Sequence, residues 1–141
     1  MPSLSFQERW APKILDGSKH QTIRRAGRWK PGMTAHLFTA MRTKRCRRLG
    51  RSQVANVVHL QRFGRERWMF VREEYVAGGK PWTLKGPPWR RLEGAMLSEW
   101  DVLALAHADG FEAVEEFEGW FDRYPPGEPL DVIVWAALER A

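Results

Sequence analysis

Short segments of strand-like composition alternate with glycine- and proline-containing turns along this chain, and this pattern restricts the possible folds more than any other feature. The strands it predicts are residues 4–6, 21–25, 34–41, 53–62, 67–76 and 130–138. The fourth and fifth of these are separated by a turn at Gly64, which predicts a hairpin, and the strongly apolar last one is expected to be central. We therefore expect an α+β fold, a small and mostly antiparallel β-barrel with a few short flanking helices.

Three segments have helical spacing instead, and capping residues mark their ends. Gly17 stands where a C-terminal cap is expected after the first of them. Ser98 and Asp101 have the spacing of a capping box, which predicts that a helix begins there. The predicted helices are residues 8–16, 98–107 and 112–122.

Length and composition indicate one folded domain. The chain has 141 residues, of which 43% are hydrophobic, so a real core is expected within a single domain covering residues 1–141. Cys46 is the one cysteine, which excludes an internal disulfide and suits a reducing compartment. No apolar run has the length of a signal peptide or a membrane span, so we expect a cytoplasmic, monomeric protein. The four histidines (His20, His36, His59 and His107) show no metal-ligand spacing, so they are interpreted as structural or surface residues, and no metal or cofactor is expected.

The charge distribution indicates a polyanionic partner. The formal net charge is +6, and residues 42–51 hold six Lys or Arg and no acid, whereas residues 112–118 are acidic. RNA or a nucleotide is the usual partner of such a basic surface, although a solvated face of a basic protein gives the same pattern. The candidate phosphate contacts are Arg24, Arg25, Arg42, Lys44, Arg45, Arg47 and Arg48.

The eight tryptophans divide into two groups. Trp100, Trp120 and Trp135 lie in periodic segments and are expected in the core. Trp82 and Trp89 lie in a loop rich in proline, glycine and cations, where aromatic rings can stack on bases. The alternative is that these two rings cover the mouth of a small barrel.

The segment 17–25, with sequence GSKHQTIRR, concentrates the most usable chemistry. It places Lys19, Thr22 and Arg24 within one turn and the start of one strand. These side chains can act as simple phosphate or base contacts, with Thr22 favoured by its strand propensity. They can also supply a base, a nucleophile and a permanent cation.

Taken in order, the motifs resemble the ASCH domain, a branch of the PUA-like β-barrel superfamily. The resemblance spans nearly the whole chain and rests on the order of several short pieces. These are Phe6 followed by ILDGSKHQTIRR, Pro31-Gly32 before a strand, the basic segment MRTKRCRRLG, ADGF followed by Glu116-Phe117 and Phe121, and the closing apolar strand. It implies a PUA-like barrel with an RNA- or nucleotide-directed cleft along the segment with Lys19, Thr22 and Arg24.

Within that family, the chain is similar to a small bacterial group of amidohydrolases that deacylate N(4)-acetylcytidine with a lysine, a threonine and a glutamate. The resemblance carries these roles to Lys19, Thr22 and Asp109, where this chain has an aspartate in place of the glutamate. Thr22 would attack the amide carbonyl, Lys19 would hold the proton, and Asp109 would bind the amine or orient water. Arg24 would stabilise the oxyanion or hold a phosphate.

Three functions follow as hypotheses from this segment and its resemblance. The first is binding of RNA or a modified nucleoside in a cleft built around Lys19, Thr22, Arg24 and Asp109. The second is deacylation of an N(4)-acylated cytidine in the same cleft. The third is metal-independent RNA cleavage, with Lys19 as base or electrostatic stabiliser and the ribose 2′-hydroxyl as nucleophile.

Overall fold

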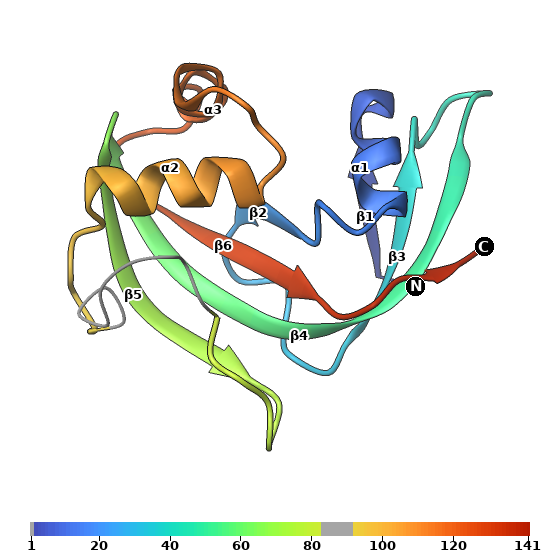
Figure 1. Ribbon diagram of the computed structural model, residues 1–141, viewed down its shortest axis with the longest axis horizontal. Coiled ribbons are helices and arrows are strands. Elements are labelled where there is room, and N and C mark those ends of the chain that lie inside the picture. Colours follow the sequence, from blue (N-terminus) through green and yellow to red (C-terminus); the bar gives the residue numbers. More distant parts are fainter. Residues whose placement is uncertain (1, 83–91) are drawn as a thin grey trace.

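A computed structural model describes residues 2–82 and 92–141, and shows an α+β protein. Its mixed, mostly antiparallel sheet has seven strands, and three short helices pack beside it (Figure 1). The strands are β1 (Ser3–Phe6), β2 (Gln21–Arg25), β3 (Thr34–Thr39), β4 (Arg47–Gly64), β5 (Arg67–Tyr75), β6 (Glu128–Trp135) and β7 (Glu139–Arg140). The helices are α1 (Ala11–Leu15), preceded by a 3₁₀ turn Glu8–Trp10, α2 (Glu99–Ala108) and α3 (Val114–Phe121).

The long strand β4 organises the sheet. Its first part pairs with β3 and β7, and its second part pairs with β6 on one side and β5 on the other. The strand order along the main path is β1-β3-β4-β6-β2, and the pairing of β1 with β3 is parallel. The predicted hairpin is confirmed as β4–β5, and the last strand, β6, is central as predicted because it lies between β4 and β2.

The sheet is curved but, within residues 2–82 and 92–141, its pairings do not close a barrel. Figure 1 shows β4 bending along its length, so that one strand belongs to two differently oriented halves of the sheet. The barrel expected from the sequence is thus replaced in these pairings by a curled sheet. Curvature comes from a bent strand with register shifts near Gly50 and Leu60, which are the irregularities that let strands turn a corner.

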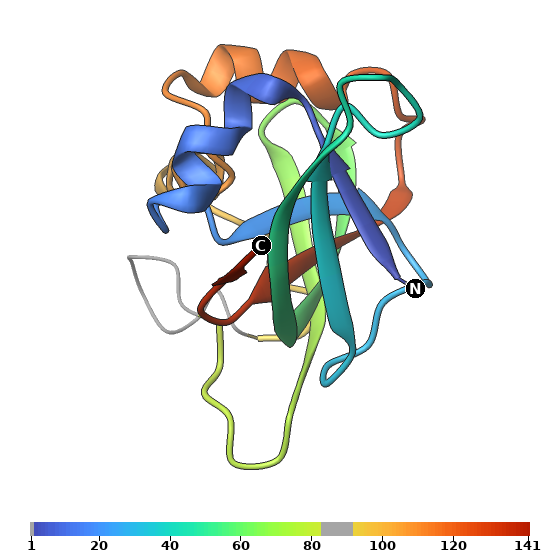
Figure 2. The ribbon, with the colours of Figure 1, turned by 90° about the vertical axis from the view of Figure 1, so that its right-hand side faces the viewer.

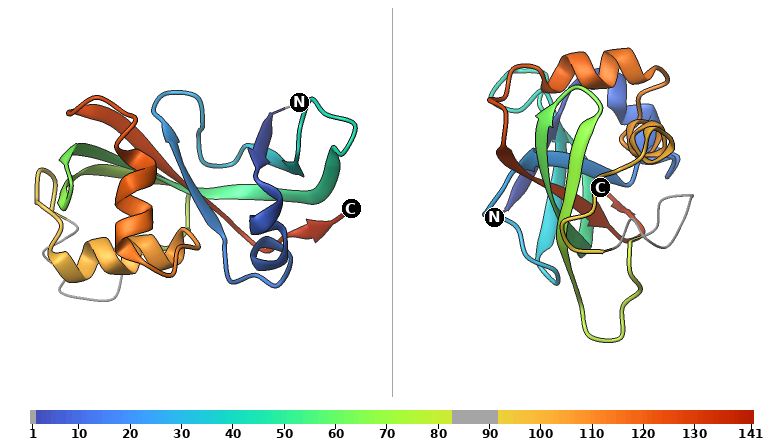
Figure 3. Two further views of the ribbon diagram at one scale, coloured as in Figure 1. Left: turned by 90° about the horizontal axis from the view of Figure 1, so that it is seen from above. Right: turned by 90° about the vertical axis from the view of Figure 1, so that its left-hand side faces the viewer.

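The helices divide between the two halves of the sheet. Figure 2 shows α1 close to the β1–β3 side, and Figure 3 shows α2 and α3 together over the other half. The buried apolar side chains form one connected cluster that includes Leu37, Val57, Trp68, Phe117 and Ile133. The segment with Lys19 enters β2 between these two groups of helices.

Local sequence signals were reliable at the helix ends. The capping box at Ser98 is confirmed, because Ser98 Oγ accepts a hydrogen bond from Asp101 N at 3.1 Å and the Asp101 carboxylate accepts one from Ser98 N at 3.1 Å. Of the tryptophans predicted in the core, Trp135 is buried and Trp120 is half-buried, but Trp100 is wrong: it is 74% exposed. Helix α2 buries Val102, Leu105 and Ala106, and Trp100 precedes Val102 by about 200° of helical rotation, so it faces away.

Candidate functional site

A buried lysine–aspartate pair lies between the two groups of helices. Lys19 is 2% exposed and precedes β2, and Asp109 is 5% exposed at the C-terminal end of α2. Lys19 Nζ donates to the carbonyl oxygen of Asp109 at 2.5 Å and to that of Gln21 at 2.9 Å. Its distance to Asp109 Oδ1 is 3.5 Å, and this oxygen has no hydrogen-bond partner within the described residues. The pair is therefore buried, but the hydrogen bonds of Lys19 Nζ go to backbone carbonyl oxygens and not to the Asp109 carboxylate.

Burial shifts both groups toward their neutral forms. It lowers the pKa of Lys19, an effect opposed by the Asp109 charge and reinforced by Arg24. Burial raises the pKa of Asp109 to about 6, although Lys19 and Arg24 pull it down. Lys19 therefore loses its proton more readily than an exposed lysine does, and Asp109 holds its proton more firmly than an exposed aspartate does. Shifts of this kind are common among acid–base and ligand-binding groups.

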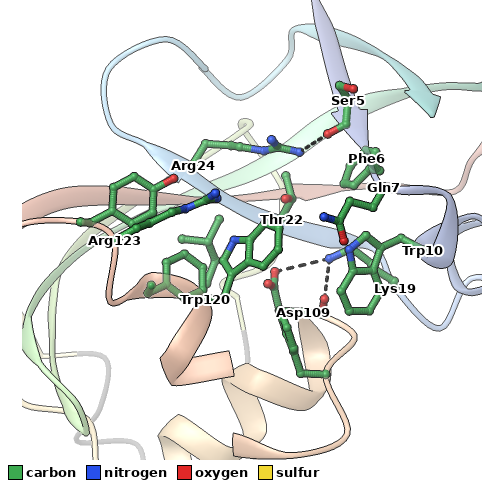
Figure 4. Close-up of a pocket in the computed structure, with 14 residues that line it drawn as sticks. Ser5, Phe6, Gln7, Trp10, Lys19, Thr22, Arg24, Asp109, Trp120 and Arg123 are labelled. Carbon is green, nitrogen blue, oxygen red and sulfur yellow. Dashed lines mark hydrogen bonds and ion pairs between the residues drawn. The ribbon is translucent and has the colours of Figure 1, made fainter. Parts of the chain in front are cut away.

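The pair opens on a cavity of about 100 Å³ lined largely by aromatic rings. Figure 4 shows Lys19 and Asp109 meeting beneath Thr22 and Arg24, with Trp10 to one side and Trp120 to the other. At about 30 Å³ for each molecule in liquid water, a volume of this size holds roughly three water molecules. The rings that line it are Phe6, Trp10, Phe111, Trp120, Phe121 and Tyr124.

Thr22 and Arg24 reach the same cavity because alternate residues of a strand point to one face. Thr22 is 6% exposed, and its hydroxyl makes no hydrogen bond with the part of the chain that the structure describes. Arg24 donates to the carbonyl oxygen of Ser5 at 2.7 Å and lies 5.2 Å from the ring centre of Phe6. Its Nε is buried without an acceptor among the described residues, so one guanidinium donor remains unused.

The turn after α2 fits the cavity only as glycine. Gly110 has φ +100°, and a Cβ there would lie 2.9 Å from Cζ3 of Trp10 and 3.2 Å from Cδ of Lys19. Lys13 Nζ donates to the carbonyl oxygen of Gly110 at 2.6 Å, which joins α1 to the end of α2. This close approach sets Asp109 beside Lys19 although the two residues are 90 positions apart.

The predicted cationic residues divide between this cavity and the surface. Arg24 lines the cavity, whereas the other candidates (Arg25, Arg42, Lys44, Arg45, Arg47 and Arg48) are exposed. Arg25 Nε lies 3.4 Å from Glu128 Oε1, and Arg48 Nη2 lies 3.2 Å from His36 Nδ1. The basic run thus covers the turn after β3 and the first residues of β4, on the surface rather than in the cleft.

The predicted stacking residues are not both accessible. Trp82 is 9% exposed, and its indole N–H donates to Gln21 Oε1 at 3.2 Å. The ring is therefore buried next to the first residue of β2. Stacking of Trp82 on a base stays a prediction, but the alternative of a covering ring describes its burial better. Trp89 lies outside the described residues.

Sequence reasoning missed most of the cavity wall. Arg123 and Tyr124 come from a segment more than 100 positions after Lys19. Phe6 and Trp10 precede it by 13 and 9 positions, and no spacing rule joins these side chains to Lys19. Arg123 lies 4.4 Å from the ring centre of Trp120, which adds a second cation at the rim. A weak signal was present in the pairing of aromatic and cationic residues around residues 120–124, which was treated only as a helix and a loop.

A second polar cluster surrounds His59, but it has the character of a structural link. Its Nδ1 lies 2.6 Å from Asp131 Oδ1, and its Nε2 lies 3.4 Å from Glu74 Oε2, so it connects β4 with β6 and β5. Among the residues that the structure describes, no three His, Cys, Asp or Glu side chains are grouped to hold a metal ion.

The chain matches no protein-family model, no curated protein and no solved structure. Within the described residues, no helix is long and apolar enough to cross a membrane. Function is therefore argued from the geometry of the cleft and from the motifs of the sequence.

Proposed function

We propose that this chain is a nucleobase-binding protein of the ASCH kind, and that the cleft around Lys19, Thr22, Arg24 and Asp109 holds a base of RNA or a modified nucleoside. The observation that carries the proposal is the buried Lys19–Asp109 pair opening on a cavity walled by aromatic rings. Planar bases bind between such rings and are read by hydrogen bonds along their edges. A cytosine edge offers both an amine donor and a carbonyl acceptor, which suit Asp109 and a cation respectively.

The order of the motifs also supports this proposal. Lys19, Thr22 and Arg24 lie in one segment, and Asp109 lies about 90 positions later, yet all four line one cavity. That is the arrangement the ASCH resemblance requires. We further propose that the curled sheet is a variant of the PUA-like barrel, with the bent strand β4 supplying the curvature.

A second candidate is hydrolysis of an N(4)-acylated cytidine, favoured by the hydrogen bonds of Lys19. A neutral lysine amine has two N–H donors and one lone pair. Two backbone carbonyl oxygens accept from Nζ, so deprotonation of Lys19 would leave its lone pair directed to a third group. The lowered pKa of Lys19 makes this neutral form more accessible than it is for an exposed lysine.

In this candidate reaction, Thr22 Oγ attacks the acyl carbonyl carbon while its proton moves to Lys19. The unused Nε–H of Arg24 is an available donor for the oxyanion that forms. Collapse of this intermediate breaks the C–N bond, and Lys19 returns the proton to the departing exocyclic amine of cytosine. Water then attacks the acyl carbon of the acyl-threonine while Lys19 or Asp109 takes its proton. The ester C–O bond breaks, the proton passes to Thr22 Oγ, and the carboxylic acid leaves.

Binding is tested by calorimetric titration of cytidine and N(4)-acetylcytidine into the protein and into Lys19→Met. We expect the variant to bind at least tenfold more weakly, because a buried charged hydrogen bond contributes about 1.5 to 3 kcal/mol. Lys80→Met is the matched control, since Lys80 is exposed and does not line the cleft. Equal affinities in the protein and in Lys19→Met would reject the cleft as the binding site.

Hydrolysis is tested by following release of cytidine from N(4)-acetylcytidine. The reaction predicts that Thr22→Val and Lys19→Met each lower kcat by about 10²- to 10⁴-fold. Binding without turnover in the unmodified protein would leave a binder and exclude the amidohydrolase. Cleavage of plain RNA in the presence of a chelator, unaffected by Thr22→Val, would instead establish the ribonuclease.

A further inference from the structure

A second depression adjoins the cleft and differs from it in character. It is an open groove of about 600 Å³, bordered by β1, the end of β2 with the following turn, and the turn after β3. Ser5 and Arg24 line both the groove and the cleft, so Arg24 lies where the two meet. Figure 2 views the molecule from the side on which β1 lies beside β3.

Among the described residues, the groove is lined by no acidic side chain and by four arginines: Arg24, Arg25, Arg28 and Arg42. Arg25 approaches Glu128, an exposed contact of small energetic value. Within residues 2–82 and 92–141, no carboxylate lies within ion-pair distance of Arg28 or Arg42. A groove with this much uncompensated positive charge is complementary to a chain of phosphates.

The backbone presents one of these cations in an unusual conformation. Arg42 has φ +66° in a turn where Ala40 also has a positive φ, and Thr43 Oγ1 closes the turn by donating to the carbonyl oxygen of Ala40 at 2.6 Å. Positive φ is unfavourable for residues other than glycine and is concentrated at functional positions. The turn thus holds Arg42 at the groove at some conformational cost.

The groove contributes charge rather than stacking. Its tryptophan, Trp29, is 4% exposed, so the ring is packed into the core and gives no platform for a base. The cleft next to it has the opposite composition, with aromatic rings around one buried ion pair. The groove therefore suits the phosphates of a nucleotide chain, and the cleft suits a base.

We propose that the groove of Arg24, Arg25, Arg28 and Arg42 binds the phosphodiester backbone of a single-stranded RNA whose unstacked base enters the adjoining cleft. This inference rests on the proposed function of the cleft and specifies its ligand as a polynucleotide rather than a free nucleoside. Arg24 connects the two sites, because it lines both and retains an unused donor. Since phosphates are alike in every sequence, the groove adds affinity and the cleft selects the base.

The test compares three probes: a fluorescein-labelled ten-nucleotide cytidine RNA, cytidine, and cytidine 5′-monophosphate. The variant is Arg28→Gln with Arg42→Gln, which removes the two unpaired cations and leaves the cleft residues unchanged. The control is Arg67→Gln with Lys80→Gln, which removes the same charge from exposed residues outside the groove. Dissociation constants are measured between 50 and 200 mM salt.

We expect the groove variant to bind the RNA at least tenfold more weakly at 50 mM salt, with its affinity for cytidine unchanged. Its plot of log K against log salt is expected to be flatter by about 1.4, because each phosphate contact on a single strand contributes about 0.7. The control is expected to change RNA affinity less than twofold. Equal losses of RNA affinity in the groove variant and the control would overturn the proposal that the groove binds phosphates.

Failure of the groove can be separated from failure of the cleft. If cytidine binds and Lys19→Met weakens it, but RNA binds no tighter than cytidine, the cleft stands and the groove proposal is overturned. If RNA binding depends on Arg28 and Arg42 but not on Lys19, the base does not enter the cleft and the proposed function fails instead. Absence of binding by all three probes would overturn both.

Discussion

Among the residues that the structure describes, two ion pairs have both side chains buried, and their surroundings differ. At one end, Arg62 of β4 meets Glu118 of α3, and both are at most 5% exposed. At the other, Lys19 meets Asp109 at the entrance to β2. The two pairs have the same separation, 3.5 Å between charged atoms, so neither burial nor distance distinguishes them.

Hydrogen bonding distinguishes them. Both oxygens of Glu118 are used, Oε1 by the indole N–H of Trp68 at 2.7 Å and Oε2 by the backbone N–H of Glu66. Asp109 Oδ1 has no hydrogen bond within the described residues and faces a cavity. Arg62 Nε has no acceptor among the described residues, so the contrast lies in the two carboxylates. A buried carboxylate whose oxygens both have donors holds structure together, whereas one with a free oxygen beside a cavity has capacity left for a ligand.

The carboxylates at the two ends also respond oppositely to their environments. Hydrogen bonds from Arg65 and Arg62 lower the pKa of Asp122 to about 2, next to the Glu118 pair. Burial raises the pKa of Asp109 to about 6. The first carboxylate stays ionised throughout the physiological range, and the second can change its charge near neutrality, as groups at binding and catalytic sites often do.

Glu118→Ala is expected to give the largest change, a loss of about 3 to 5 kcal/mol in the free energy of unfolding. The substitution removes one of the two carboxylates that face the buried Arg62, which keeps Asp122 at 3.0 Å. It also leaves the indole N–H of Trp68 and the backbone N–H of Glu66 without their acceptor, and each such loss costs about 1 to 3 kcal/mol. Urea unfolding at pH 7 measures the loss. Glu116→Ala is the control, because Glu116 forms an exposed pair with Arg9 and is expected to contribute less than about 1 kcal/mol.

The milder Glu118→Gln keeps an oxygen for Trp68 and is the variant to use if Glu118→Ala does not fold. It should lose less stability and leave cytidine affinity unchanged. If Glu118→Ala lowers the free energy of unfolding by less than about 1 kcal/mol, the Arg62–Glu118 pair is not structural, and its contrast with the Lys19–Asp109 pair fails.

Asp109→Asn is expected to change stability by an amount that depends on pH and that favours the variant more as the pH rises. The folded-state pKa of about 6 lies above the reference value of 3.8, so the folded protein binds this proton more tightly than the unfolded chain. Stability from this group is therefore lost as pH rises from about 4 to 6. The asparagine variant lacks this loss, so its stability relative to the unmodified protein should rise by about 2 kcal/mol between pH 4 and pH 7.

Urea unfolding of both proteins at the two pH values measures this difference. Asp122→Asn is the matched control, because its carboxyl pKa is lowered and its loss should destabilise the protein at pH 7. An advantage for Asp109→Asn that did not change with pH would mean that Asp109 is not held near its neutral form.

The strands were predictable where local composition decides them. Residues 21–25 were predicted as a strand and form β2 with the same bounds, and the capping box at Ser98 was read correctly. The basic residues at the start of β4 were not predicted as strand, because their pairing with β3 depends on a partner and not on their own propensity. The error at Trp100 has the opposite cause, since a large ring was assumed to be buried without regard to its helical phase.

The site was predictable only in part. Lys19, Thr22 and Arg24 are neighbours in one segment, so local reading brings them together, and the family resemblance supplied Asp109. Trp10 and Tyr124 join the cavity only through the tertiary fold. The contrast between Asp109 and Glu118 is equally hidden in the sequence, because both are acidic residues in or beside a helix and their hydrogen-bond partners lie on other elements.

Trp82→Leu tests whether Trp82 only packs beside the site or also contacts RNA. Its effect on stability and binding is expected to be the smallest. Trp82 is buried and its indole N–H serves Gln21, which follows Lys19 by two positions. The substitution removes this hydrogen bond and part of the packed ring, for an expected loss of about 2 kcal/mol in stability. RNA affinity, measured at a temperature where the variant is folded, should change less than twofold. A ring that stacks on a base contributes about 1 to 3 kcal/mol to binding, so a loss of tenfold or more would show that Trp82 leaves its buried position to contact RNA.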